Sequence, residues 1–360
     1  MNARIDWGTS VATGIFLIGC FGRAVAGGLP CDQVNAFVKA NPSLAYSEYD
    51  SYPYCSPNGS PVMHYQQTTA TVSFLAQSIS SMASRGEFFS TDGAPFIVGQ
   101  SGFRGMAAGG AGSKWSLWGN AARNGIDFRD HGMKHDGHVN NLILGADYRL
   151  LHNTSLGLSL AIDNGDISTK FNGGRIDTRN TAVAAYLSHS INRNLAVDAM
   201  FGFGNGRYDQ SIGGITGDTD VDRKFFAANM AYQHWFGSTV QLLGKAGILH
   251  AAEKKGGFLF GGGRQPGADN EMDQLRLTAR IGYWAVNGIM PYASMSYVND
   301  MGSVESPGRV HLDNSGVSFS LGADFFSKQG ITGGVAYNSR EYGRRAARND
   351  SFVLNIGMRF

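Results

Sequence analysis

The residues best suited to metal chemistry lie close together, about a third of the way along the chain. They are three histidines and two aspartates, namely His131, His135, His138, Asp130 and Asp136. Imidazole nitrogens and carboxylate oxygens are ordinary zinc ligands, so this spacing permits a metal site. A solvated polar loop has the same composition and requires no ion. We expect the polar loop, and therefore no metal.

Hydrolytic chemistry is the second possibility to weigh. Asp127 lies in the same stretch as these residues. A cluster of acids and histidines within one loop resembles the catalytic group of a barrel enzyme, but it is not evidence for one. The run 99–102 (GQSG) falls short of a nucleophile elbow, because Phe103 occupies the position of the last glycine. The run 261–263 (GGG) is better explained as a flexible loop than as a phosphate cradle. We therefore expect no catalytic residue and no cofactor.

Composition and charge narrow the class of protein. Glycine supplies 50 of the 360 residues, roughly twice its average share. Charged residues account for 16%, and the formal charge of +2 argues against a nucleic-acid partner. No run of about eighteen apolar residues occurs beyond the N-terminus, which excludes a bundle of membrane helices. A transmembrane β-barrel stays compatible with a mean hydropathy of −0.17, because half of each strand is polar.

The first 26 residues are typical of a secretory signal peptide. Arg4 precedes an apolar core at 11–21 (VATGIFLIGCF), and the run 24–26 (AVA) fits the small-x-small cleavage rule. The run 17–20 (LIGC) resembles a lipobox, so a lipoprotein signal is the alternative. Export implies an oxidising compartment. Cleavage after Ala26 leaves two cysteines, and we expect a disulfide between Cys31 and Cys55.

Two segments separate this signal from the rest of the chain. Residues 27–65 are a short aperiodic segment, too small to bury much core alone. Residues 66–112 comprise a helix candidate at 66–85 and a glycine-rich linker. The apolar positions of the helix recur at helical spacing, and they include Val72, Leu75, Ile79 and Met82. About twenty residues span roughly 30 Å, and the polar remaining faces suit a polar lumen. Packing outside a barrel is the alternative.

The last ten residues show the pattern that organises the chain. Phe352, Leu354, Ile356, Met358 and Phe360 form an apolar stripe at period two, with mostly polar residues between them. Since a strand alternates its side chains between two faces, this predicts a strand with one apolar and one wet face. The pattern recurs in twelve segments, at about 114–122, 138–150, 154–163, 180–190, 193–204, 223–236, 238–249, 273–285, 288–299, 314–326, 329–341 and 350–360.

The connections between these segments alternate in length. Five are short, and the other six are polar or glycine-rich. Five of those six are long, at about 123–137, 164–179, 205–222, 250–272 and 300–313. Such alternation and an even strand number are typical of outer-membrane barrels. We therefore predict an all-β membrane protein, with a 12-stranded antiparallel transmembrane β-barrel over residues 113–360 and an N-terminal α-helix in or near the lumen.

The polar face of the strands is expected to line the lumen. Its charged positions are Asp147, Arg149, Asp163, Arg276, Arg280, Asp324 and Arg359. We expect these charges to pair with one another across the water-filled interior. Such pairs would primarily stabilise the barrel.

The sequence from Trp115 onward resembles the translocator domain of autotransporters, the type V secretion family. The similar pieces are 115–119 (WSLWG), 145–150 (GADYRL), 163–174 (DNGDISTKFNGG), 291–300 (PYASMSYVND) and the terminal Phe360. The helix candidate resembles the family's helix that precedes and plugs the barrel. The chain departs from the family in its passenger, because only about forty residues precede the helix and they contain no repeat.

The resemblance implies a barrel in the outer membrane of a Gram-negative bacterium, with surface-exposed loops. The barrel would translocate or display the short N-terminal segment, and the C-terminal stripe with Phe360 would be read by the barrel-assembly machinery. Lipid and lipopolysaccharide would surround a monomeric barrel, with lipopolysaccharide phosphates near a basic run of Arg340, Arg344, Arg345 and Arg348. A stand-alone barrel that serves as adhesin, pore or envelope scaffold is the alternative.

Overall fold

The computed structural model describes one main block of the chain. The described residues are Ala40 and 114–130, 133–170, 174–212, 215–260, 263–265, 267–285, 288–305, 309–327, 331–342 and 346–359. The predicted signal peptide, the Cys31–Cys55 disulfide and the helix at 66–85 lie outside these residues. Within them, no helix has the length and apolar character needed to cross a membrane.

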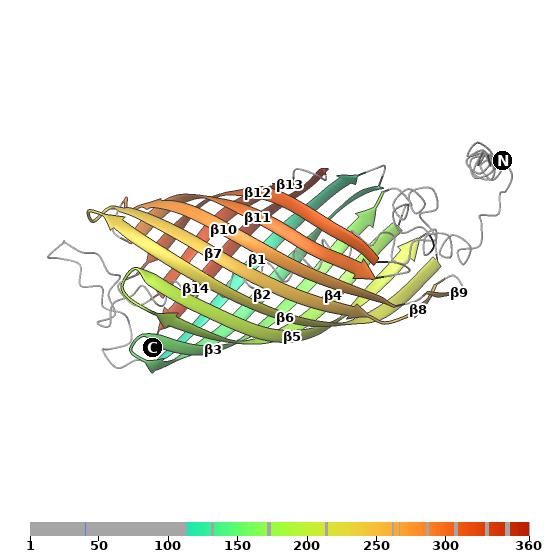
Figure 1. Ribbon diagram of the computed structural model, residues 1–360, viewed down its shortest axis with the longest axis horizontal. Coiled ribbons are helices and arrows are strands. Elements are labelled where there is room, and N and C mark those ends of the chain that lie inside the picture. The colour runs from blue at the N-terminus through green and yellow to red at the C-terminus, as the bar shows by residue number, and fades with distance from the viewer. Residues whose placement is uncertain are drawn as a thin grey trace, which may run out of the picture.

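Twelve antiparallel strands close into a single barrel, as predicted (Figure 1). Each strand pairs with its neighbour in the chain, and β14 pairs with β1 to close the ring. The strands are β1 (Trp115–Asp130), β2 (Met133–Leu151), β3 (Thr154–Thr169), β4 (Gly174–Ser190), β5 (Leu195–Ile212), β6 (Ile215–Phe236), β7 (Val240–Lys255), β10 (Ala268–Tyr283), β11 (Ile289–Glu305), β12 (Arg309–Phe326), β13 (Ile331–Tyr342) and β14 (Ala346–Arg359). Closure leaves no unpaired edge, which is what a sheet needs in lipid.

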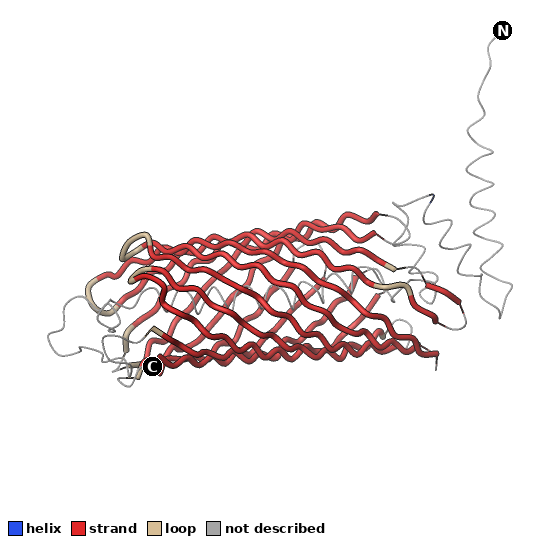
Figure 2. Tube along the Cα trace, turned by 90° about the horizontal axis from the view of Figure 1, so that it is seen from below, coloured by secondary structure: helices blue, strands red, loops and turns tan. Residues whose placement is uncertain are grey.

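The two ends of the barrel differ in their connections. One end carries the tight connections 152–153, 191–194 and 237–239, together with the start of β1 and the end of β14. We call it the short-turn end; it lies at the left in Figures 1 and 2. The opposite end is the far end, where a small two-stranded sheet of β8 (Phe258–Phe260) and β9 (Gly263–Gln265) extends the wall.

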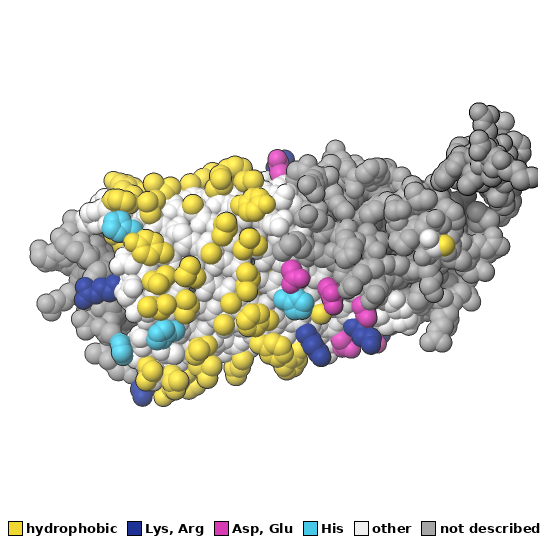
Figure 3. Space-filling model, in the orientation of Figure 1, with side chains coloured by type: hydrophobic (Ala, Val, Ile, Leu, Met, Phe, Trp, Pro, Cys, Tyr) yellow, Lys and Arg dark blue, Asp and Glu magenta, His cyan; other side chains and the backbone are white. Residues whose placement is uncertain are grey.

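An apolar belt surrounds the half of the barrel next to the short-turn end (Figure 3). Large apolar side chains point outward from every strand of this zone, for example Leu158, Phe201, Leu321 and Ile356. Their neighbours in sequence point into the lumen. The exposure of so many large apolar side chains is explained by lipid, because a soluble surface of this kind would associate.

The predicted long loops are wrong over most of their length, because the strands continue through them. β5 runs to Ile212 and β6 starts at Ile215, so almost all of 205–222 is strand. The predicted strands ended where the outward residues become polar. The ladder of backbone hydrogen bonds does not depend on lipid, however, so the barrel wall extends past the apolar belt.

In this extension the outward face becomes charged, and part of the inward face becomes apolar. The outward positions carry charged side chains such as Asp166, Arg175 and Arg207. The inward positions of β1 to β4 carry a buried apolar cluster formed by Ile126, Val139, Ile167 and Ile176. Period two is kept, and the outward face becomes polar as expected where water replaces lipid around the wall. The inward face becomes apolar on β1 to β4 and stays mostly polar on β5 to β10.

Two inward aromatic rings occupy the space left by glycines on the adjacent strand. Trp118 is paired with Gly145, and Tyr186 with Gly157. A Cβ atom on Gly145 would lie 2.2 Å from the Trp118 ring, and one on Gly157 would lie 2.1 Å from the Tyr186 ring. No other residue therefore fits at these two positions without moving a ring. The centroids of the two rings lie 6.1 Å apart, and the rings lie against the inner wall between β1 and β4.

Candidate functional site

The candidate site is the polar inner wall of the barrel. Buried polar side chains occur on the inward face of almost every strand, and those of β3 to β6 include Ser159, Asp163, Thr178, Asn180, Asp198, Gln210, Thr219, Arg223 and Gln233. A polar group removed from water must find a hydrogen-bond partner. The wall therefore consists of local networks, of which three are well defined.

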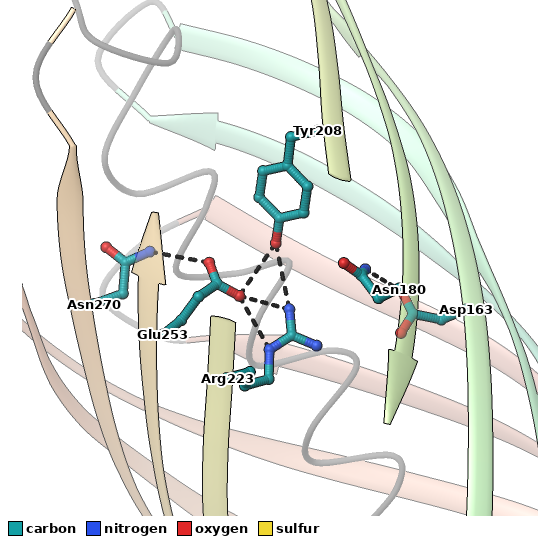
Figure 4. Close-up of polar contacts among 6 residues, drawn as sticks. All are labelled: Asp163, Asn180, Tyr208, Arg223, Glu253 and Asn270. Atoms are coloured by element: carbon teal, nitrogen blue, oxygen red, sulfur yellow. Dashed lines mark hydrogen bonds and ion pairs between the residues drawn. The ribbon is translucent and has the colours of Figure 1, made fainter. Parts of the chain in front are cut away.

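The largest network joins four strands beyond the apolar belt (Figure 4). Arg223 of β6 donates to Glu253 of β7 through Nη2, 2.5 Å from Oε2, and through Nε, 3.0 Å from the same oxygen. Their side chains are 4% and 0% exposed. Tyr208 of β5 donates to Glu253 Oε2 at 3.2 Å, and Asn270 of β10 donates to Oε1 at 3.3 Å. Both carboxylate oxygens of Glu253 are thus satisfied.

A second pair lies beside this network. Asn180 of β4 donates through Nδ2 to Asp163 Oδ1 of β3 at 2.6 Å, and both side chains are buried. Asp163 was expected to meet another charge; the structure places it against the neutral amide of Asn180 and near enough to Arg223 for the two charges to interact. Figure 4 shows both groups on the same side of the lumen, on strands that are consecutive in the barrel. Together the pair and the network connect side chains of β3, β4, β5, β6, β7 and β10 in the part of the wall that lies beyond the apolar belt.

A third network lies at the short-turn end. Asp147 of β2 accepts hydrogen bonds from Ser116 Oγ at 2.9 Å, from Trp118 Nε1 at 3.3 Å and from the Tyr186 hydroxyl. Trp118 Nε1 also donates to the Tyr186 hydroxyl at 2.7 Å. The predicted lumen residue Asp147 therefore faces inward, with neutral donors as its partners. It connects the two rings that cover Gly145 and Gly157.

The structure does bring two of the predicted charged residues together. Arg280 of β10 forms an ion pair with Asp324 of β12 across β11. The guanidinium also lies 3.6 Å from the ring centroid of Tyr292, on β11 between them. A cation over an aromatic face is held by the ring quadrupole. This arrangement crosses three strands and is an ion pair of the kind that the sequence led us to expect in the lumen.

Two of the three remaining predicted lumen residues have described side chains. Arg276 donates through Nη2 to Gln274 Oε1 at 3.3 Å and is half-buried. Arg149 is also half-buried and lies where the register between β2 and β3 shifts. Arg359 is the last residue of β14, and its side chain lies outside the described part of the structure.

Sequence reasoning missed the central residues of the largest network. Tyr208 and Glu253 lie in stretches that were predicted to be loops, and Arg223 was the first residue of a predicted strand. A signal was present, because the run Leu249, Ala251, Glu253 and Lys255 continues the inward positions of β7 at period two. An alternation of buried and exposed positions predicts a strand even where some of the residues are charged. The prediction missed it because polar residues were assigned to loops.

The two described residues of the basic run, Arg340 and Arg348, do not lie on one patch. Arg340 pairs in register with Asn349 and Arg348 with Glu341, so Arg340 and Arg348 lie on opposite faces of the wall. Arg348 is exposed and donates to Asp350 at 2.9 Å. Arg344 and Arg345 lie outside the described residues. Arg340 and Arg348 therefore do not act together on one face, and the lipopolysaccharide contact stays a prediction.

The cations of the extension are engaged with aspartates instead. Arg175 lies 2.8 Å from Asp166 and 3.1 Å from Asp177. The hydrogen bond to Asp177, and then the charges of both aspartates, raise the pKa of Arg175 above its usual value. Arg207 is held similarly between Asp209 at 3.3 Å and Asp218 at 2.7 Å. These guanidinium groups keep their positive charge, and the adjacent carboxylates balance it.

The metal site weighed from the sequence is not assembled among the described side chains. No group of three potential metal ligands comes together among them. His138 is described and half-buried, whereas the side chains of His131 and His135 lie outside the described part of the chain. The described polar groups of the lumen wall take part in hydrogen bonds and ion pairs.

Comparison with known proteins agrees with this architecture. Residues 116–338 match the family described as Autotransporter beta-domain. The translocator domain of the autotransporter NalP from Neisseria meningitidis is similar, with 15% identity and a TM-score of 0.60 over 81% of this chain and 99% of that chain. The β-domain of the Bordetella autotransporter Brka has 18% identity and a TM-score of 0.58, over 69% and 100%.

A third solved structure has the same fold. The transport unit of the autotransporter AIDA-I from Escherichia coli has 12% identity and a TM-score of 0.51, over 78% of this chain and 98% of that chain. At these identities the likeness is one of fold. No curated protein sequence matches the chain.

Proposed function

The chain belongs to the autotransporter family through its β-domain, an outer-membrane translocator, and from this premise we propose that the barrel carries its own N-terminal segment to the cell surface. Membership places the barrel in the outer membrane of a Gram-negative bacterium and makes it a transport domain. The finer proposal is that residues 27–65 are displayed at the far end, with the segment 66–112 inside the lumen.

The position of β1 is the observation that carries the proposal. β1 starts at Trp115, beside Tyr148 near the end of β2, so the preceding chain joins the barrel at the short-turn end. Short turns face the periplasm in outer-membrane barrels. A segment that starts in the periplasm and is displayed outside must then run through the lumen.

The polar inner wall is compatible with such a passage. β1 has 16 residues, which at about 3.3 Å each give a wall roughly 53 Å long measured along the strand. A helix of about twenty residues covers roughly 30 Å, and the linker that follows it can supply the rest. A thin helix with Ser, Thr and Gln on most faces can exchange hydrogen bonds with the wall. Its four apolar positions, given above, fit the same proposal.

Display can be tested with a protease-sensitive epitope inserted after Asp50. On intact cells we expect added protease to remove the epitope, because residues 27–65 lie outside the outer membrane. A matched insertion in the short connection 237–239 is the control, since that turn is expected to face the periplasm and stay protected. Removal of the Asp50 epitope only after permeabilisation would contradict the proposal and favour a barrel scaffold with a periplasmic extension.

We further propose that the C-terminal strand is the signal for the barrel-assembly machinery. Phe352, Leu354, Ile356 and Met358 all point outward and are well exposed. β14 is also the strand that closes the barrel against β1. Phe360 itself lies outside the described residues.

Deletion of Phe360 separates recognition from intrinsic folding. In cells we expect a several-fold loss of folded barrel in the outer membrane, measured by heat-dependent migration on gels. Refolding of the urea-denatured variant into detergent micelles, which contain no machinery, should be unchanged. Equal losses in cells and in micelles would show that Phe360 acts on barrel stability and is not a recognition signal.

A further inference from the structure

The short-turn end carries an outward ring of basic side chains on one side of the barrel. Lys114 precedes β1, His152 and Arg193 lie in the β2–β3 and β4–β5 connections, and His234 lies near the end of β6. All four side chains are exposed. They follow the arc from β1 to β6, immediately beyond the apolar belt. We call these four residues the cationic rim; its permanent cations are Lys114 and Arg193.

Acidic side chains at this end point the other way. Those on the terminal turns of the described strands are Asp147, Asp198 and Asp324. Asp147 accepts from Ser116 and Asp198 accepts from Asn229 Nδ2 at 2.8 Å, while Asp324 pairs with Arg280. All three are committed to partners in the lumen wall, so they do not neutralise the cationic rim from outside.

Aromatic side chains accompany the cations. Trp115 and Tyr148 lie 5.0 Å apart, and Lys114 Nζ lies 5.8 Å from the Tyr148 ring centroid. The rings of His234 and Phe236 pack edge to face, with their centroids 4.7 Å apart. Trp and Tyr at the limit of an apolar surface mark the headgroup level of a bilayer. A lysine there extends its ammonium group towards water and phosphate.

The outward face of the far end has a different electrostatic character. Two of its arginines, Arg175 and Arg207, each lie between two aspartates, and other exposed cations there include Arg123, Arg179 and Lys224. The outward positions of β6 and β10 add more acids, including Asp220, Asp222, Asp269 and Glu271. On the described outer surface, the cations of the far end are therefore mixed with acids, whereas those of the short-turn end have no outward acid among them.

We propose that the cationic rim binds the phosphate headgroups of an anionic phospholipid of the phosphatidylglycerol type. These lipids occupy the leaflet at the short-turn end, on the arc from β1 to β6. The inference rests on the proposed function only in taking the barrel as inserted in the outer membrane. It assigns a lipid class to one leaflet and so orients the barrel.

Quenching of tryptophan fluorescence by brominated lipid tests this assignment. The full-length protein is reconstituted in phosphatidylcholine vesicles that contain brominated phosphatidylglycerol, and the binding constant is compared with that of brominated phosphatidylcholine. Trp115, which is 52% exposed beside Lys114, reports on this leaflet. A Lys or Arg near the surface favours anionic lipid by about a factor of five. We expect a clear preference for phosphatidylglycerol that decreases as salt is added.

Substitutions locate the effect on the molecule. Lys114→Gln combined with Arg193→Gln should remove most of the preference, and Lys114→Gln alone should remove about half of it on a logarithmic scale. The control pair, Arg175→Gln with Arg207→Gln, removes two cations at the far end and should leave the preference unchanged. Heat-dependent gel migration verifies that each variant is folded.

The alternative outcomes are distinct. Equal quenching by the two lipids in the wild type, or loss of the preference in the control pair only, would overturn the assignment. Displacement of the quencher by lipopolysaccharide more effectively than by unlabelled phosphatidylglycerol would identify lipid A as the occupant and overturn it too. The measurement uses purified protein in vesicles, so it does not depend on whether residues 27–65 are displayed on cells.

Discussion

Replacing Glu253 by alanine is expected to destabilise the folded barrel by about 3–5 kcal/mol, the usual cost of leaving a buried charge without its partner. The substitution removes the ion-pair partner of the buried Arg223 guanidinium, which keeps the Tyr208 hydroxyl at 3.3 Å and the more distant charge of Asp163. Asn270 loses its acceptor as well. The midpoint of urea-induced unfolding, followed by tryptophan fluorescence in lipid vesicles, measures the change.

An acid on the outer wall supplies the matched control. Asp218 pairs with Arg207 at 2.7 Å, but both side chains are more than half exposed. Asp218→Ala should leave the midpoint almost unchanged, because water and salt compensate an exposed pair. Equal effects of Glu253→Ala and Asp218→Ala would show that the Glu253 network carries no special stability.

A double substitution separates charge from packing. Arg223→Met with Glu253→Leu removes both charges and keeps most of the volume. Replacing a buried ion pair by apolar residues is often neutral, so this variant should recover a large part of the stability lost in Glu253→Ala. A double variant as unstable as the single one would show that the contacts to Tyr208 and Asn270 matter more than the charge.

The second large effect is expected on the lipid-facing surface. Leu158 lies in the middle of the outward stripe of β3 and is 67% exposed, between Leu156 and Leu160. Leu158→Arg should destabilise the barrel in vesicles by about 2–4 kcal/mol, because an arginine at the bilayer midplane must be taken out of water. The same unfolding measurement in vesicles records the loss.

The control variant tests whether the effect depends on the depth of the substituted residue in the bilayer. Asn205 is also exposed and outward-facing, but it lies past the apolar belt and pairs in register with Asp222. Asn205→Arg should therefore cause little change, since the new cation meets water and an acid. Comparable losses at positions 158 and 205 would mean that the apolar belt does not contact lipid, and that the barrel does not sit in the bilayer at the depth of the belt.

Much of this architecture is local in origin and was predicted from the sequence. Alternation such as Leu156, Leu158 and Leu160 against Gly157 and Ser159 is a property of a few consecutive residues. It specifies a strand and its two faces without reference to any partner. The number of strands, the antiparallel barrel and the outward stripe of β14 follow from repeating that local pattern. Where lipid gives way to water the pattern keeps its period but changes its polarity, which is why the strand ends were misplaced.

The partners of the polar side chains were decided only by the tertiary structure. Arg223 and Glu253 are 30 residues apart, Arg280 and Asp324 are 44 apart, and Trp118 and Tyr186 are 68 apart. Their meeting depends on the register of each strand pair and on closure of β1 against β14. A shift of one residue in any register would turn a lumen residue towards lipid. The sequence by itself determined which faces are polar, whereas register and closure decided which polar groups meet, because those are properties of the complete ring.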